Sequence, residues 1–233
     1  MNKRIEELKK EVLNANLDLV NHGLVILTWG NVSAYDKESG LVVIKASGIE
    51  YENMGVEHMT VTDLDGKIVE GKFKPSSDLP THLVLYKASP GIGSVVHTHS
   101  GFATIWSQTG KAIPCLGTTH SDYFCGEIPN TRKMTPEEIN SNYEENTGHV
   151  IVERFKDLDY AKMRAVLVHS HGPFVWGDTP NDAVLNSVVL EYVAKMAFCN
   201  SEMANGKPDI IQEELMLKHY NRKFGKDAYY GQK

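Results

Sequence analysis

Two short apolar runs of this chain, "VVHTHS" and "VLVHSHG", both end in a pair of histidines separated by one residue. Side chains two residues apart on a β-strand point to the same side, so His97 and His99 can present two imidazoles to one ion. A single pair of this kind is weak evidence, because a histidine is often only a partly buried polar residue. The second pair, His169 and His171, also follows a predicted strand. A third histidine that converges on the first two makes a metal site the favoured interpretation.

The imidazole ligands narrow the choice of metal and of fold. Imidazole suits zinc and similar first-row ions, and a catalytic zinc commonly keeps three protein ligands with one position open. The segment "SGFATIW" lacks the glutamate that a cupin needs, and Gly101 stands where a metallo-β-lactamase needs aspartate. An amidohydrolase needs a full barrel of typically about 250 residues. The chain also contains no P-loop and no G-x-G-x-x-G motif.

Composition excludes several classes of partner and compartment. The 233 residues carry a net charge of −6 and a pI near 5.9, which argues against a nucleic-acid or anionic-membrane partner. The basic residues Lys218, Arg222, Lys223 and Lys226 are spaced like the solvated face of a helix. Three cysteines at no metal-finger spacing, and no apolar run long enough to cross a membrane, indicate a soluble, cytoplasmic protein.

Hydrophobic periodicity predicts a mixture of helices and strands in a single layered α/β domain over residues 1–233. The capping sequences that begin at Thr135 and Thr179 predict two helix starts, because each offers a capping hydroxyl, a proline and an acid. The predicted helices cover about 5–22, 80–88, 180–200 and 208–224, and the predicted strands cover 24–28, 41–45, 93–99 and 165–172, with a hairpin over 59–69 that turns at Asp65-Gly66.

Three loops carry small polar groups that suit an anion. "TWGN" (28–31), "KASG" (45–48) and "KPSSD" (74–78) each follow an apolar run and offer hydroxyls, backbone N–H groups and a nearby lysine. Such donors can bind a phosphate. Taken singly, each is more often an ordinary turn or helix cap, and Ser77 or Asp78 can simply cap the following helix.

The whole chain, read in order, resembles a known enzyme family. The segments "LTWGNVSA", "KPSSDLPTH", "VVHTHS", "GTTHSDYFCG", "VHSHGPFVWG" and "KHYNRKFGKDAYYG" are similar to those of the L-ribulose-5-phosphate 4-epimerases of the class II aldolase group. The resemblance implies a three-layer αβα sandwich with a central, largely antiparallel sheet. It also implies a homotetramer whose active sites lie between neighbouring subunits.

The resemblance also assigns roles to individual residues. It implies a zinc ion, with manganese or cobalt as alternatives, and excludes His169 from the ligands. An aspartate at position 78 favours an epimerase, since related aldolases typically have glutamate there, and Ala46 departs from the proline often found in the phosphate loop. The implied metal ligands are Asp78, His97, His99 and His171; the substrate phosphate is held by Gly30, Asn31, Ser47, Gly48, Ser76 and Ser77; the acid/base pair is Asp122 and Tyr230, with Thr118 and His219 nearby.

The implied reaction interconverts L-ribulose 5-phosphate and D-xylulose 5-phosphate with inversion at C4. The C4 hydrogen is not acidic, so inversion needs retro-aldol cleavage of C3–C4, rotation of the aldehyde and re-addition, with a Lewis-acid metal that stabilises the enediolate. An acid and a base must then serve opposite faces, which suits Asp122 and Tyr230. Without the family, Asp122 is equally a loop cap and Tyr230 ordinary tail packing. The rival functions are an aldolase that releases its aldehyde and a non-catalytic scaffold.

Overall fold

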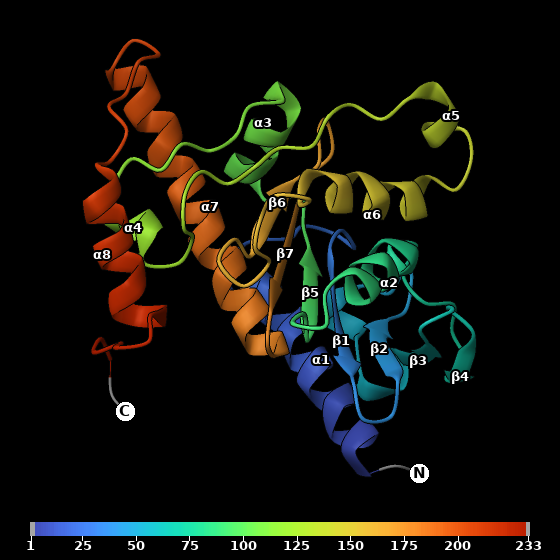
Figure 1. Ribbon diagram of the computed structural model, residues 1–233. Helices are drawn as coiled ribbons and strands as arrows, with labels where there is room; N and C mark the ends of the chain where they lie inside the picture. Colours follow the sequence, from blue (N-terminus) through green and yellow to red (C-terminus); the bar gives the residue numbers. More distant parts are fainter. Residues whose placement is uncertain (1–2, 232–233) are drawn as a thin grey trace.

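The computed structural model of the protein describes residues 3–231. Within this part of the chain, seven strands form one sheet in the order β4-β3-β2-β1-β5-β7-β6, and every neighbouring pair is antiparallel (Figure 1). The strands are β1 (Asn31–Asp36), β2 (Leu41–Lys45), β3 (Met59–Asp63), β4 (Ile68–Glu70), β5 (Ser94–His97), β6 (Ala165–Leu167) and β7 (Pro173–Gly177).

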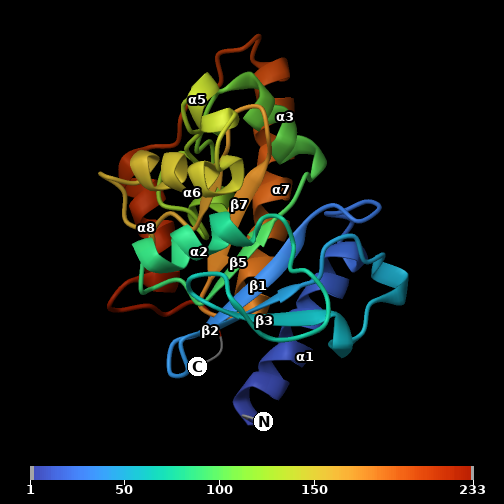
Figure 2. The same ribbon diagram turned by 90° about the vertical axis from the view of Figure 1, so that its right-hand side faces the viewer.

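Helices cover both faces of this sheet. They are α1 (Lys3–Asn21), α2 (Leu79–Ala88), α3 (Gly101–Thr109), α4 (Thr118–Ser121), α5 (Pro136–Ile139), α6 (Tyr143–Arg154), α7 (Pro180–Met203) and α8 (Glu213–Phe224), with short 3₁₀ turns at Tyr51–Asn53 and Val56–His58. The helices α1 and α7 pack on the strands from one side, and α2 and α6 lie together on the other, in front of the strands in Figure 2. The expected three-layer sandwich with an antiparallel sheet is therefore confirmed. None of the helices within residues 3–231 has both the length and the apolar character that crossing a bilayer requires.

Local sequence explains most of these elements. In α1, the apolar residues that recur every three or four positions are the buried ones, Ile5, Leu8, Val12, Ala15 and Leu19. All four residues of β5 are buried, as expected for a central strand with helices on both faces. The capping boxes predicted at Thr135 and Thr179 are both present, and each threonine hydroxyl accepts a hydrogen bond from the backbone N–H three residues later.

The predicted strand at 24–28 is wrong. The backbone of Leu27 has φ 54°, in the left-handed region that no strand uses, and the N–H of Trp29 donates to the carbonyl of Ile26 to close a turn. Ile26 and Leu27 are 61% and 74% exposed, so this run is apolar without being a core strand. The strand begins later, at Asn31.

Two other predicted elements have different boundaries. The strand predicted over 165–172 ends at Leu167, because the chain then turns through Ser170 at φ 62°. The helix predicted over 208–224 begins only at Glu213. The N–H of Ile211 donates instead to the carbonyl of Cys115, which holds residues before the helix as an extended segment against the loop that precedes α4.

Candidate active site

The order of the strands brings four chain segments together at one end of the central strands. Because β2, β1, β5 and β7 alternate in direction, the end of β2, the start of β1, the end of β5 and the start of β7 lie side by side. In this register Asn31 pairs with His97, and His97 pairs with Phe174. Residues far apart in the sequence therefore meet where the strands end.

Three histidines converge at this end of the strands. The ligand nitrogens of His97, His99 and His171 all lie within 4.8 Å of one another. The Nδ1 atom of His97 lies 3.0 Å from the carbonyl oxygen of Pro173, so Nδ1 carries the proton and Nε2 keeps its lone pair. That Nε2 lies 3.1 Å from Nε2 of His99. The hydroxyl of Tyr143 lies 3.3 Å from Nδ1 of His171 and can orient that ring.

The surroundings favour the neutral form of His99 and His171. Burial, followed by the neighbouring imidazoles, lowers the pKa of His171 to about 3, and burial also lowers the pKa of His99. Neutral imidazoles cannot all satisfy one another, since a lone pair that faces another nitrogen needs a donor or a cation. The donor set therefore fits a divalent metal ion that accepts imidazole ligands.

Asp78 contributes a carboxylate to the same site. It precedes α2 at the N-cap position, yet its side chain makes no capping hydrogen bond. Its Oδ2 accepts instead from Nδ2 of Asn31 at 2.6 Å. Burial alone would raise the pKa of Asp78, but attraction to His97 and His82 and the Asn31 hydrogen bond lower it. The carboxylate is therefore ionised, and its hydrogen bond with Asn31 orients it toward the site instead of capping the helix.

A cavity of about 320 Å³ joins the histidines to the polar loops. It is lined by Thr28, Trp29, Gly30, Asn31, Lys45, Ser47, Gly48, Ser76, Ser77, Asp78, His97, His99 and His171. All six residues expected to hold phosphate are among them. The amide of Asn31 also donates to Oγ of Ser76, whereas its Oδ1 is buried and has no partner within residues 3–231, so it is free to accept from a ligand.

Lys45 also belongs to this site, although the family resemblance gave no role to it. This lysine is only 2% exposed; its Nζ donates to the carbonyl of Thr28 at 3.2 Å and lies 4.4 Å from the ring centroid of Tyr51. Burial lowers its pKa to about 8, and the nearby Asp78 carboxylate opposes that shift. The signal in the sequence was a lysine that ends the apolar run "LVVIK", since a buried strand seldom ends in a charge without a partner.

Gly30 is required for the close approach of the phosphate loop to the histidines. Its φ is +78°, and a Cβ atom there would lie 2.9 Å from the carbonyl oxygen of His97. Any other residue would therefore push the loop away from the cavity.

His169 does not join the other histidines. Its Nδ1 lies 2.8 Å from Oγ of Ser170, and its backbone N–H donates to Oγ1 of Thr131. The left-handed conformation of Ser170 separates the two rings, so only His171 turns toward His97 and His99. Of the second pair, therefore, only His171 lies in the cluster.

The remaining expected site residues form a second group elsewhere in the chain. Asp122 follows α4, and its Oδ1 lies 3.1 Å from Nδ1 of His219 on α8. Tyr230 lies in the segment after α8, where its backbone N–H donates to the carbonyl of Arg222. None of these residues, nor Thr118 at the start of α4, lines the cavity, and Figure 1 places α4 and α8 on the outer side of α7. One chain therefore holds the two parts of the expected site apart.

Arg222 corrects the expectation of a solvated basic face on the last helix. Its Nε and Nη2 donate to the two carboxylate oxygens of Asp122 at 3.1 and 2.8 Å. Lys223 is also engaged, with Nζ 3.3 Å from the ring centroid of Tyr123. Only Lys218 and Lys226 of the four basic residues are exposed.

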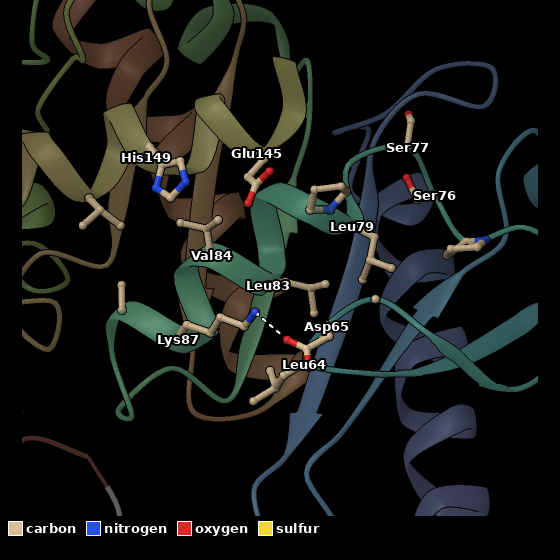
Figure 3. Close-up of a pocket in the computed structure, with 15 residues that line it drawn as sticks. Leu64, Asp65, Ser76, Ser77, Leu79, Leu83, Val84, Lys87, Glu145 and His149 are labelled. Atoms are coloured by element: carbon tan, nitrogen blue, oxygen red, sulfur yellow. Dashed lines mark hydrogen bonds and ion pairs between the residues drawn. The ribbon is translucent and has the colours of Figure 1, made fainter. Parts of the chain in front are cut away.

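A larger hollow, about 750 Å³, lies between α2, α6 and the turn after β3 (Figure 3). Its walls are mainly apolar, with Leu64, Leu83 and Val84 prominent, and an ion pair between Lys87 and Asp65 spans 3.1 Å. It contains no convergent set of metal ligands, and the three clustered histidines lie outside it. The clustered histidines and the polar loops line the smaller cavity instead.

Comparison with known proteins places this geometry in a family. Residues 10–198 match the class II aldolase and adducin N-terminal domain family. Proteins of Salmonella paratyphi B and Salmonella typhi named L-ribulose-5-phosphate 4-epimerase UlaF are 53% identical over 98% of this chain and 100% of their own length.

Solved structures agree on the fold. An L-fuculose 1-phosphate aldolase has a TM-score of 0.78 at 24% identity, covering 93% of this chain and 95% of its own. YgbL of Klebsiella pneumoniae, described as a putative aldolase/epimerase/decarboxylase, has a TM-score of 0.72 at 22% identity, covering 91% of this chain and 97% of its own. With its sheet, its histidine cluster and these relatives in agreement, the chain belongs to the class II aldolase and adducin family.

Proposed function

We propose that this protein is a cytoplasmic, metal-dependent epimerase that interconverts L-ribulose 5-phosphate and D-xylulose 5-phosphate by cleaving and re-forming the C3–C4 bond. The observation that carries the proposal is the single cavity in which three clustered histidines meet a buried lysine and several hydroxyl groups. A sugar phosphate needs both parts, one for its reacting end and one for its phosphate. The names of relatives 53% identical to the chain support the same substrate.

The metal would be held by His97, His99 and His171, with Asp78 facing it, and zinc is the ion we expect, with manganese or cobalt as substitutes. When bound, such an ion acts as a Lewis acid that stabilises the negative charge left on the C2 and C3 oxygens as the C3–C4 bond breaks. The tautomer of His97 fixed by Pro173 keeps its Nε2 available for that ion.

The phosphate group must stay bound while the aldehyde rotates, because a released aldehyde would make the protein an aldolase. Lys45, Ser47 and the Ser76–Ser77 pair line the same cavity as the histidines and supply a charge and hydroxyl donors. The backbone N–H groups at Gly48 and Gly30 belong to the same loops. Holding the phosphate at this end leaves the carbonyl carbon of the aldehyde free to present either face for re-addition.

The acid and the base would come from a neighbouring subunit. One of Asp122 and Tyr230 accepts the proton of the C4 hydroxyl as C3–C4 breaks, and the other donates a proton to the C4 oxygen as the bond re-forms on the opposite face. Neither lines the cavity of its own chain, and α4 and α8, the helices that precede them in the chain, lie on the outer side of α7 in Figure 1. The ring of Trp29 lies 5.8 Å from that of His99, and Trp29 is exposed together with Ile26 and Leu27 just before it in the chain, which supports docking of a second chain there. A cyclic homotetramer would complete every site in this way.

The decisive assay follows the products of L-ribulose 5-phosphate. We expect D-xylulose 5-phosphate in a coupled reaction, with no accumulation of free glycolaldehyde phosphate. Accumulation of the aldehyde would assign the protein to the aldolase alternative. The His97→Asn variant serves as the blank. If the metal-loaded protein neither epimerises the substrate nor releases the aldehyde, the protein would be a non-catalytic scaffold.

A further inference from the structure

Arg222 occupies the centre of the group that contains the proposed acid and base. Its guanidinium binds both oxygens of Asp122, at 3.1 and 2.8 Å, from a position 100 residues later in the chain. The same guanidinium lies 4.5 Å from the ring centroid of Tyr230. Its own carbonyl accepts the backbone N–H groups of Tyr229 and Tyr230 at 2.9 and 3.0 Å. One residue therefore contacts both proposed proton-transfer groups.

We propose that Arg222 is the positioning residue of the epimerase, which fixes the carboxylate of Asp122 and the ring of Tyr230 relative to each other before a neighbouring chain presents its substrate. This inference rests on the function proposed above. Arg222 touches no part of the metal cavity of its own chain, so it acts through the other two side chains.

The geometry on Asp122 explains why an arginine is needed. A carboxylate at the end of a short helix can rotate about its χ2 bond, and a single donor such as His219 restrains only one of its oxygens. The planar fork of arginine binds two oxygens at once and fixes the plane of the carboxylate. Asp122 and Arg222 are both partly buried, with side chains 19% and 22% exposed, so solvent weakens this pair less than a fully exposed one.

The contacts with the tail explain the order of Tyr230. A residue so close to the end of a chain is normally loose unless it is docked. Here two backbone hydrogen bonds and a cation–π contact bind the tail to Arg222, while the tyrosine side chain remains 55% exposed. The ring of Tyr230 is thus held against Arg222 and is still open to a substrate from outside the chain.

The test uses the assembled, metal-loaded enzyme and compares Arg222→Met, Arg222→Lys and Asp122→Asn, with Lys218→Met as a control. Lys218 is an exposed cation of the same helix, and within residues 3–231 it makes no ion pair. We expect Arg222→Met to lower kcat by about 10- to 100-fold, the usual scale for a displaced catalytic group. KM, metal content and oligomer size should stay unchanged. Arg222→Lys keeps the charge but not the fork, so it should recover only part of kcat.

A double variant separates positioning from mere stability. If Arg222 acts through Asp122, then Arg222→Met should cost much less in an Asp122→Asn background than in the native one. Losses that simply multiply, or a loss of kcat that parallels dissociation of the oligomer, would overturn the inference. Native kcat in Arg222→Met while Asp122→Asn is slow would also overturn it and leave the proposed function standing. Native rates in both Asp122→Asn and Tyr230→Phe would instead refute the acid/base assignment itself. If Arg222→Met fails to fold, the kcat of the Arg222→Lys variant decides on its own.

Discussion

Mixed oligomers of a Tyr230→Phe chain and a His97→Asn chain should regain activity that neither variant has alone. Each change disables a different part of the site: His97→Asn removes one of the three clustered imidazoles, and Tyr230→Phe removes a hydroxyl that lies in the segment after α8. Because the two parts do not meet within one chain, each homo-oligomer lacks one part at every site. A mixed oligomer can pair an intact metal part with an intact tail.

The size of the recovery follows from counting the pairs. In a cyclic oligomer assembled at random from equal amounts, about half of the metal parts are intact and about half of the adjoining tails are intact, so about a quarter of the sites are complete. If instead both parts belonged to the same chain, every chain would carry one defect and no site would be complete. A site shared between subunits therefore predicts about a quarter of native activity, and a site within one chain predicts none.

The experiment unfolds the two variants together, reassembles them with zinc, and measures epimerisation per site. Reassembled native protein gives the reference value, and mass measurement of differently tagged chains confirms that mixing took place. Activity that stays at the level of the separate variants, in oligomers shown to be mixed, would refute a site shared between subunits.

Four further outcomes follow from the site. Chelation should abolish turnover and zinc, manganese or cobalt should restore it, whereas full turnover by metal-free protein would contradict the metal site. His97→Asn should weaken metal binding measured by titration, but His169→Asn should leave it intact, because only the former belongs to the cluster. Asp122→Asn should slow epimerisation by about 100-fold or more while fold and metal content persist; an unchanged rate would make it a loop cap. Lys45 has a pKa lowered to about 8, so its charge is lost as the pH rises through that value; kcat/KM should fall there, and Lys45→Gln should lack this step.

The sequence predicts best what is decided within a few residues. The capping boxes at Thr135 and Thr179 need only side chains three positions apart, and both formed as expected. The spacing of His97 and His99 likewise places two imidazoles together, although β5 ends at the first of them. Short apolar runs are less informative, since the run at 24–28 buries Leu24 and Val25 but exposes Ile26 and Leu27, and forms no strand.

What the sequence could not reveal depends on distant partners. The role of Lys45 is set by Thr28, Tyr51 and Asp78, which approach it only when β2 and the loops around it are assembled. From the sequence, Arg222 is expected to be one of several cations on a solvated helix face, because its partner Asp122 is 100 residues away. The separation of the acid/base residues from the histidines also needs the three-dimensional structure, because motif order along a chain contains no distances.

The turn that joins β1 to β2 lies at the end of these strands that is opposite the histidines. The strand β1 has six residues, so this turn is about 20 Å from Asn31 at about 3.3 Å per residue. Lys37 and Glu38 are exposed in this turn, and the backbone N–H and the hydroxyl of Ser39 close the turn by donating hydrogen bonds to the carboxylate of Asp36. A fluorescent reporter or an affinity peptide inserted there would follow the chain without disturbing the metal cavity, whereas the same insertion at the other end of β1 would destroy it.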